Sequence, residues 1–250
     1  MFFQPHEKFY DSPSHYAIDY EDISLLTADN EQLHGWRLIP QKPVTHTVIF
    51  FHGNAENIST HFRNVVWLLN DGVQVILFDY RGYGRSSGVA ELDGALSDIV
   101  QSTAYAIDQF AANTPVFVFG QSLGAAMTIT ALAKQPALTE RINGFIFEAS
   151  FTRYRSIAQY SLGNFWLTWL VQIPLSWTAI SKHDPVDHIG FIQAPLLILH
   201  SQDDQIIPLA HAKDLHRAAP NSLLWITRGQ HINSARNPDY RAQIREFLGL

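Results

Sequence analysis

Short, almost wholly apolar runs recur along this chain, and longer stretches with helical spacing of apolar residues separate them. A run without polar alternation is typical of a strand buried on both faces of a parallel sheet, because neither face meets water. Parallel neighbours need crossover connections, and the intervening stretches are long enough to supply helices for them. Including a first pair that we expect to form an antiparallel hairpin, the predicted strands are 20–27, 32–38, 47–51, 73–78, 116–119, 144–147, 196–200 and 222–226.

The predicted helices complete this pattern, and they are 60–70, 92–112, 123–134, 209–218 and 239–247. The alternation predicts an α/β fold, with a mostly parallel sheet of about eight strands and helices on both faces. No repeat or Gly/Ser-rich linker divides the chain, so we expect residues 1–250 to form a single domain. The stretch from 151 to 192 is longer than one connecting helix needs, and we expect residues from about 155 to 185 to form a small aromatic cap within the domain.

The composition excludes several classes of site. The 250 residues carry a formal net charge of −6 and so offer no basic excess to neutralise the phosphates of a nucleic acid. The absence of cysteine excludes disulfides, zinc–thiolate sites, iron–sulfur clusters and a cysteine nucleophile. The pairs His183/His188 and His211/His216 are five residues apart, which is a poor spacing for two ligands on one helix face. We therefore expect no metal, no other cofactor and no nucleic-acid partner.

No apolar run approaches the roughly 18–20 residues that a membrane-spanning helix needs. The longest run, at 165–173, ends at Pro174, and residues 1–5 lack the features of a signal peptide. We expect a cytoplasmic protein with at most weak contact with a membrane surface. A membrane-associated or periplasmic location stays open if the natural chain has a longer N-terminus, and nothing in the sequence indicates an oligomeric state.

The most informative motif is Gly120-Gln121-Ser122-Leu123-Gly124, which lies directly between a predicted strand and a predicted alanine-rich helix. A serine at the centre of such a turn is a nucleophile elbow, in which the glycines allow a tight reversal and the hydroxyl stands clear of the sheet. The start of the helix then points toward a reacting carbonyl. Ser122 is therefore the predicted nucleophile.

A serine nucleophile needs a base, and the base needs a carboxylate to orient it. His231 follows the last predicted strand, so we expect it at the same edge of the sheet as Ser122. Asp204 follows the strand before it, which gives the chain order nucleophile, acid, base. Asp203 and Glu148 remain alternatives for the acid, since both lie near the ends of neighbouring strands.

The oxyanion that develops in an acyl-transfer reaction needs two backbone N–H donors. Leu123, the residue after the nucleophile, supplies one of them. Gly53 follows the predicted strand at 47–51 and lets the backbone turn so that the next N–H groups face the nucleophile. We expect Asn54 to supply the second donor, with Ala55 as the alternative.

These residues belong to longer stretches that resemble the α/β-hydrolase superfamily, and within it the branch of small serine hydrolases that includes the Bem46-like and ABHD13/ABHD17-like proteins. The resemblance runs from about residue 10 to the C-terminus and rests on 33–36, 52–59, 79–86, 120–124, Asp204 with 207–208, and His231. It implies the α/β-hydrolase fold and a serine hydrolase with Ser122, Asp204 and His231 as catalytic residues.

Two stretches of the resemblance carry expectations about structure. Glu56 stands where this branch usually has glycine, and we expect its carboxylate to point to solvent, because a negative charge beside an oxyanion would oppose it. The stretch 79–86 follows a predicted strand, and its Gly82 and Gly84 permit backbone conformations that other residues avoid. We expect this loop to be structural, with Arg81 tying neighbouring loops together.

The sequence predicts a serine hydrolase that cleaves carboxylic ester or thioester bonds of small apolar acyl substrates through an acyl-enzyme intermediate. The apolar substrate class rests on the aromatic residues of the stretch 151–177, which either pack on the sheet or line an acyl pocket or a lipid-facing patch. Two alternatives remain open: a peptidase that uses the same residues, and a catalytically silent binding protein on the same fold.

Overall fold

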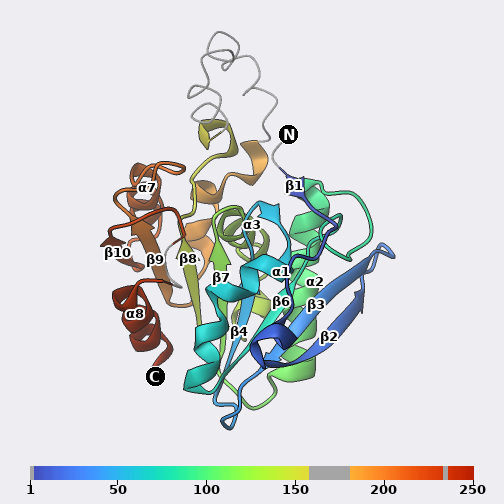
Figure 1. The fold of residues 1–250 in the computed structure, drawn as a ribbon. Helices are drawn as coiled ribbons and strands as arrows, with labels where there is room; N and C mark the ends of the chain where they lie inside the picture. The colour runs from blue at the N-terminus through green and yellow to red at the C-terminus, as the bar shows by residue number, and fades with distance from the viewer. Residues whose placement is uncertain (1–2, 158–180, 233–235) are drawn as a thin grey trace.

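The computed structural model describes residues 3–157, 181–232 and 236–250, and an eight-stranded sheet forms its centre (Figure 1). The strand order is β10-β9-β8-β7-β4-β6-β3-β2, and neighbours are parallel except that β3 runs antiparallel to both β2 and β6. The strands are β2 (Asp19–Leu26), β3 (Gln32–Ile39), β4 (His46–Phe51), β6 (Val73–Phe78), β7 (Val116–Gln121), β8 (Gly144–Glu148), β9 (Leu196–Ser201) and β10 (Leu223–Thr227). The predicted mostly parallel sheet and its N-terminal hairpin are confirmed.

The central strands are buried on both faces, as their continuous apolar character predicts. Every residue of β6, β7, β8 and β9 is buried, and β4 is buried from Thr47 onward. The edge strand β2, by contrast, carries exposed acidic residues and buries Ile23. Two apolar cores result, one on each face of the sheet.

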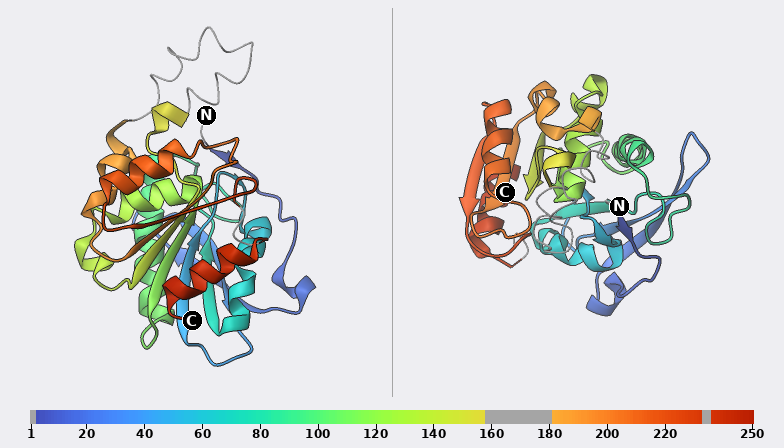
Figure 2. Two further views of the ribbon diagram at one scale, coloured as in Figure 1. Left: turned by 90° about the vertical axis from the view of Figure 1, so that its left-hand side faces the viewer. Right: turned by 90° about the horizontal axis from the view of Figure 1, so that it is seen from above.

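Helices cover both faces of the sheet, and four of the five predicted helices are confirmed (Figure 2). The helices of one face are α2 (Leu92–Phe110), α3 (Leu123–Leu132), the short α4 (Pro136–Thr139) and α7 (Ala210–Ala218). Those of the other face are α1 (Ile58–His61) and α8 (Pro238–Leu248). The 3-10 turns are η1 (Pro13–Tyr16), η2 (Phe62–Asn64), η3 (Val66–Asp71), η4 (Ser181–His183), η5 (Pro185–Asp187) and η6 (Ile189–Phe191). No helix in the described ranges combines the length and the apolar character that crossing a bilayer requires.

The stretch 60–70, predicted as one α-helix, consists of the end of α1 followed by η2 and η3, so that prediction is wrong. Its buried residues are Phe62, Val65, Trp67 and Leu68, and three of them, Phe62, Val65 and Leu68, recur every three positions. This spacing suits the three residues per turn of a 3-10 helix better than the 3.6 of an α-helix. Gly72, with φ at 78°, ends the segment in the left-handed conformation.

The sequence does not predict the small second sheet. In it, β1 (Gln4–Pro5) runs parallel to β5 (Ala55–Glu56), which lies in the loop after β4. Two-residue strands carry no periodicity that a sequence can reveal. The pairing brings the N-terminal segment to the carboxyl edge of the main sheet (Figure 1).

The expected aromatic cap at about 155–185 falls largely on residues 158–180, which lie outside the described residues. The described residues just before and just after this stretch contact each other. Arg153 pairs with Asp184 at 3.0 Å, and the N–H of Tyr154 donates to the same carboxylate at 2.9 Å. The residues before 158 and after 180 therefore lie close together.

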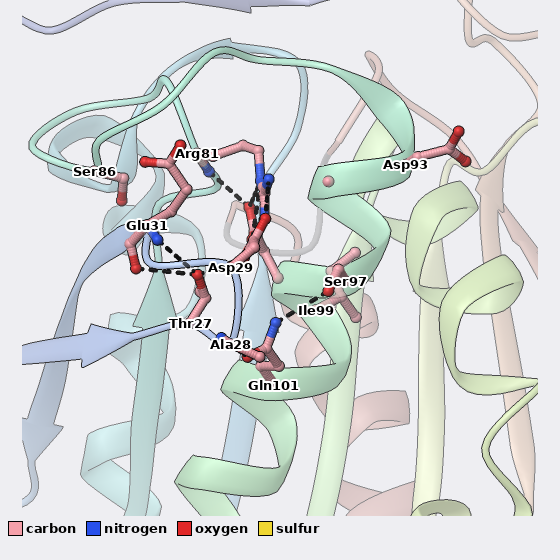
Figure 3. Close-up of polar contacts among 12 residues, drawn as sticks. Thr27, Ala28, Asp29, Glu31, Arg81, Ser86, Asp93, Ser97, Ile99 and Gln101 are labelled. Atoms are coloured by element: carbon pink, nitrogen blue, oxygen red, sulfur yellow. Dashed lines mark hydrogen bonds and ion pairs between the residues drawn. The ribbon is translucent and has the colours of Figure 1, made fainter.

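A partly buried ion-pair network ties the loop after β6 to α2 and to the β2–β3 hairpin (Figure 3). The Arg81 guanidinium lies 2.7 Å from Asp98 on α2 and 2.8 Å from Asp29 in the hairpin turn. Burial raises the pKa of Asp98 although Arg81 opposes the shift, whereas the hydrogen bond from Arg81 lowers the pKa of the exposed Asp29 to about 2. Gly82 and Gly84, with φ at 76° and 56°, let the loop turn. Arg81 therefore joins neighbouring loops, as the sequence predicts.

Replacing Arg81 with methionine should destabilise the protein by about 3–5 kcal/mol, because the buried Asp98 carboxylate loses its charged partner. The matched control is Asp29→Asn, which removes the exposed partner of the same guanidinium and should cost less than about 1 kcal/mol. Urea unfolding at neutral pH measures both losses. Equal losses in the two variants would contradict the view that the buried pair holds the loop.

Candidate active site

Ser122 stands on a tight turn between β7 and α3. Its backbone adopts φ 55° and ψ −119°, a conformation that residues other than glycine rarely occupy. Its N–H donates to the carbonyl of Glu148 on β8 at 2.9 Å, and its carbonyl accepts the N–H of Ala126 at 3.2 Å. Hydrogen bonds on both sides therefore hold the strained residue in place.

Space explains the two glycines of the motif. A Cβ atom on Gly120 would lie 2.6 Å from the Cα of Ala125, and one on Gly124 would lie 2.3 Å from the carbonyl oxygen of His52. Both contacts are with backbone atoms, which cannot move aside without displacing a helix or a strand. The first turn of α3 is thus pressed against the end of β4.

The structure brings His231 and Asp204 to Ser122. His231 lies in the loop after β10, with Nε2 at 3.0 Å from the Ser122 hydroxyl oxygen. Its Nδ1 lies 2.7 Å from Oδ2 of Asp204. Asp204 lies in the loop after β9, and its side chain is fully buried. A continuous line of hydrogen bonds therefore runs from the serine to the carboxylate.

The other two candidate acids have different partners. Asp203 is exposed and accepts the N–H of Gly229 at 3.2 Å. Glu148 is buried behind the serine turn, where it accepts a hydrogen bond from the side chain of Gln121. Among the described residues, Asp204 is the carboxylate that lies against the His231 imidazole.

The surroundings of Asp204 favour its ionised form. Burial would raise its pKa, but the hydrogen bond and charge of His231, together with the backbone N–H groups of Ile207 and Ile206, outweigh burial and lower it. These two N–H groups donate to Oδ1 at 2.9 and 2.8 Å, which leaves Oδ2 for His231. His200 packs nearby, 3.5 Å from Oδ2, and burial lowers its pKa.

The loop 52–57 borders Ser122 on its other side. A Cβ atom on Gly53 would lie 3.7 Å from the Cβ of Ser122, so this loop reaches the serine. Within the described part of the chain, the N–H groups of Asn54 and Leu123 donate to no acceptor. That these two N–H groups bind the oxyanion stays a prediction.

Glu56 has a left-handed backbone, with φ at 63°, in this same loop. Glycine adopts that conformation without steric cost, which accounts physically for a glycine at the corresponding position of the resembling branch. Glu56 is half-buried. That its carboxylate points to solvent stays a prediction.

Two side chains that contact this loop are absent from the predicted site residues. Tyr83 donates to the carbonyl of Asn54 at 2.8 Å, and His61 donates to that of Ala55 at 2.8 Å. Tyr83 lies in the stretch 79–86, which the sequence marks only as structural. His61 carries no signal, because it lies in a segment predicted to be an ordinary helix.

No group of three or more His, Asp and Glu side chains in the described ranges is arranged to hold a metal ion. The histidines spaced by five have other partners: His183 contacts Asp93 on α2 at 2.5 Å, and His211 contacts the hydroxyl of Thr152 at 2.8 Å.

A sheet of this order, with a serine turn after β7, a carboxylate after β9 and a histidine after β10, defines an α/β hydrolase. A family model described as "Serine aminopeptidase, S33" matches residues 42–189, which is more than half of the chain. The chain therefore belongs to this family of the α/β-hydrolase superfamily. Its finer placement in the Bem46-like branch stays a prediction.

Relatives span nearly the whole chain. The uncharacterized protein YfhR of Escherichia coli K12 is 30% identical over 99% of this chain and 86% of its own length. The lysophosphatidylserine lipase ABHD12 of Xenopus tropicalis is 29% identical over 81% of this chain and 57% of its own length. The solved structure of the Pyrococcus furiosus esterase Pf2001 matches with a TM-score of 0.83 at 21% identity, over 100% of this chain and 98% of its own, which shows the shared fold. The family match supports a hydrolase of the serine type.

Asp204→Asn should lower stability at neutral pH and change its pH dependence. The pKa of Asp204 is lowered in the folded protein, so its ionised form adds stability above the unfolded-state pKa of about 3.9. That contribution is lost as the pH falls through the lower folded-state pKa, so the variant and the wild type should converge in acid.

Urea unfolding from neutral pH to about pH 3 measures this gap. The exposed neighbour provides the control, since Asp203→Asn should leave a much smaller gap at every pH. A gap between wild type and Asp204→Asn that stays constant into acid would mean that the carboxylate charge is not what the site stabilises.

Proposed function

We propose that the protein is a serine hydrolase that cleaves carboxylic ester or thioester bonds of small apolar acyl substrates. Ser122 is the nucleophile, His231 is the general base, and Asp204 is the carboxylate that orients His231. The observation that carries this proposal is the hydrogen-bonded line from Ser122 Oγ through His231 to Asp204, at 3.0 and 2.7 Å. Its members lie 109 and 27 residues apart in sequence. Such an alignment has no evident use in packing, whereas it is what an activated serine requires.

In the first half of the reaction, Ser122 Oγ attacks the acyl carbon while His231 Nε2 takes the hydroxyl proton. The carbonyl electron pair moves to oxygen, and the N–H groups of Leu123 and Asn54 donate to that oxyanion. The intermediate then collapses, the bond to the alcohol or thiol breaks, and the leaving group takes the proton from His231. The acyl group stays on the serine as an ester.

In the second half, His231 takes a proton from water, and the hydroxide that forms attacks the acyl-serine carbonyl. Collapse of the second intermediate releases the carboxylic acid and returns the proton to Ser122. Asp204 serves both halves in the same way. It accepts the Nδ1–H of His231, which leaves Nε2 to accept the serine proton, and its negative charge stabilises the imidazolium.

The relatives support an ester of an apolar acyl group. Pf2001 is named an esterase, and ABHD12 is named a lysophosphatidylserine lipase. The aromatic stretch 151–177 adds no support of its own. Its described members, Phe151 and Tyr154, are buried in the core of one sheet face, as expected for packing, and the others lie outside the described residues.

A peptidase on the same residues is the second candidate, because the matching family is described as serine aminopeptidase. The steps would be the same, except that His231 must protonate an amine as it leaves. Comparing p-nitrophenyl esters of graded chain length with aminoacyl p-nitroanilides separates the two. Faster turnover of the anilides would favour the peptidase.

Ser122→Ala should lower kcat on p-nitrophenyl esters by at least about 10⁴-fold, because the reaction loses its nucleophile. Ser97→Ala removes an exposed hydroxyl on α2 and should keep wild-type rates. A fluorophosphonate probe should add one label to the wild type and none to Ser122→Ala, as shown by intact mass. A wild type that neither turns over esters nor takes the label would instead be a silent binding protein.

A further inference from the structure

The loop after β4 is held by a run of side-chain hydrogen bonds. Four consecutive backbone carbonyls in it, at residues 52 to 55, each accept a hydrogen bond from a side chain. The pairs are Tyr80 Oη to the carbonyl of His52 (2.9 Å), His52 Nδ1 to Gly53 (2.8 Å), Tyr83 Oη to Asn54 (2.8 Å) and His61 Nε2 to Ala55 (2.8 Å). We call these four side chains the carbonyl brace.

The brace determines where the N–H groups of the loop point. In a trans peptide the C=O and the following N–H point in opposite directions. His52 holds the peptide that carries the Asn54 N–H, and Tyr83 holds the next peptide, which carries the Ala55 N–H. Both N–H groups therefore point away from the side chains that hold them. The peptides on both sides of Asn54 are fixed.

The brace lies in a tightly packed, buried setting. Tyr83 and Tyr80 are buried, and burial raises the pKa of both, so each hydroxyl keeps its proton. Burial, with a smaller effect of His52, lowers the pKa of His61 to about 4, so its imidazole is neutral near pH 7. The His52 ring contacts those of Tyr80, His61 and Tyr83, with centroids 4.5, 5.2 and 5.3 Å apart. The donors thus support one another.

The N-terminal segment holds the same loop from outside. The N–H of Gln4 donates to the side-chain oxygen of Asn54 at 3.1 Å, next to the pairing of β1 with β5. The side-chain amide of Asn57 donates to the carbonyls of His6 and Lys8 at 2.7 and 2.8 Å. Loops on a protein surface are ordinarily its mobile parts, but contacts on both sides restrain this one.

We propose that Tyr83 is a positioning residue for the oxyanion site, where its hydroxyl fixes the peptide after Asn54 and so holds Asn54, whose own N–H is the loop donor, from its C-terminal side. This inference rests on the proposed function, since the oxyanion forms during acyl transfer. Such a site is effective because its donors need no rearrangement as charge develops. Without the Tyr83 hydroxyl, the Asn54 carbonyl loses this donor and the peptide after Asn54 is free to rotate, so Asn54 and its N–H are restrained only by the peptide that His52 holds. Binding of the transition state should then suffer more than binding of the substrate.

Tyr83→Phe tests the proposal, because it removes one oxygen and keeps the ring. On p-nitrophenyl esters it should lower kcat about 10- to 100-fold and change KM by less than about threefold. Inhibition by an alkyl trifluoromethyl ketone, whose serine adduct carries an oxyanion, should weaken by a similar factor. The matched control is Tyr105→Phe, in which a half-buried ring packed against Phe78 and Phe110 loses its hydroxyl away from the loop, and it should behave as wild type.

Hydrogen-exchange mass spectrometry of the peptide that contains residues 52–57 adds a readout independent of turnover. Tyr83→Phe should speed exchange in this peptide, whereas Tyr105→Phe should not. Wild-type exchange in Tyr83→Phe, an unchanged kcat, or a loss of kcat without weaker ketone inhibition would each overturn the inference. If the wild type hydrolyses no ester, the proposed function fails, and the exchange measurement still decides whether Tyr83 holds the loop.

Discussion

The contact between the first turn of α3 and the end of β4 organises the site. Gly124 lets the helix backbone lie against the carbonyl oxygens of Phe51 and His52, where a Cβ atom would be only 2.4 and 2.3 Å away. The neighbouring strands β4 and β7 are in register at this point, with Phe51 beside Gly120. The serine turn and the loop 52–57 therefore cannot separate unless two central strands move. Because those strands are buried on both faces, the sheet itself fixes the distance between the nucleophile and the N–H groups of the loop.

Buried polar contacts behind the turn keep Ser122 in its strained conformation. The Gln121 side chain joins Asn64 at 2.9 Å and also joins Glu148, while the Glu148 carbonyl accepts the Ser122 N–H at 2.9 Å. A backbone in a sparsely populated region costs of order 1–3 kcal/mol and persists only where its surroundings over-determine it. Glu148, which the sequence offers as an alternative acid, therefore supports the turn from behind, and its carboxylate lies on Gln121 rather than on the histidine.

The sequence predicts those parts of the fold that depend on the pattern of apolar residues, but it does not predict those that depend on loop geometry. The central strands β4, β6, β7, β8 and β9 follow from their continuous apolar runs, because burial on two faces leaves few polar positions. The prediction for the segment 60–70 is wrong, because its buried residues include a spacing of three that suits 3-10 turns, whereas the prediction rests on the apolar stripe alone. A sequence pattern also cannot decide whether Asp203 or Asp204 contacts the histidine, since the two residues are adjacent and chemically identical. The loop decides it by presenting the N–H groups of Ile206 and Ile207 to Asp204 alone.

The carbonyl brace answers a physical problem that regular secondary structure cannot solve. A loop that offers N–H groups to an oxyanion must leave those N–H groups unpaired, so it cannot be a helix interior or a paired strand. Its carbonyls nevertheless need donors where they are withdrawn from water, as those of His52 and Gly53 are. Side-chain hydroxyl and imidazole groups satisfy the carbonyls without occupying the N–H groups, which backbone pairing would consume along a strand. The donors to this loop include Tyr80, Tyr83 and His61. Two of them belong to the stretch 79–86, which the sequence predicts to be structural, so this stretch contributes to the arrangement of the site.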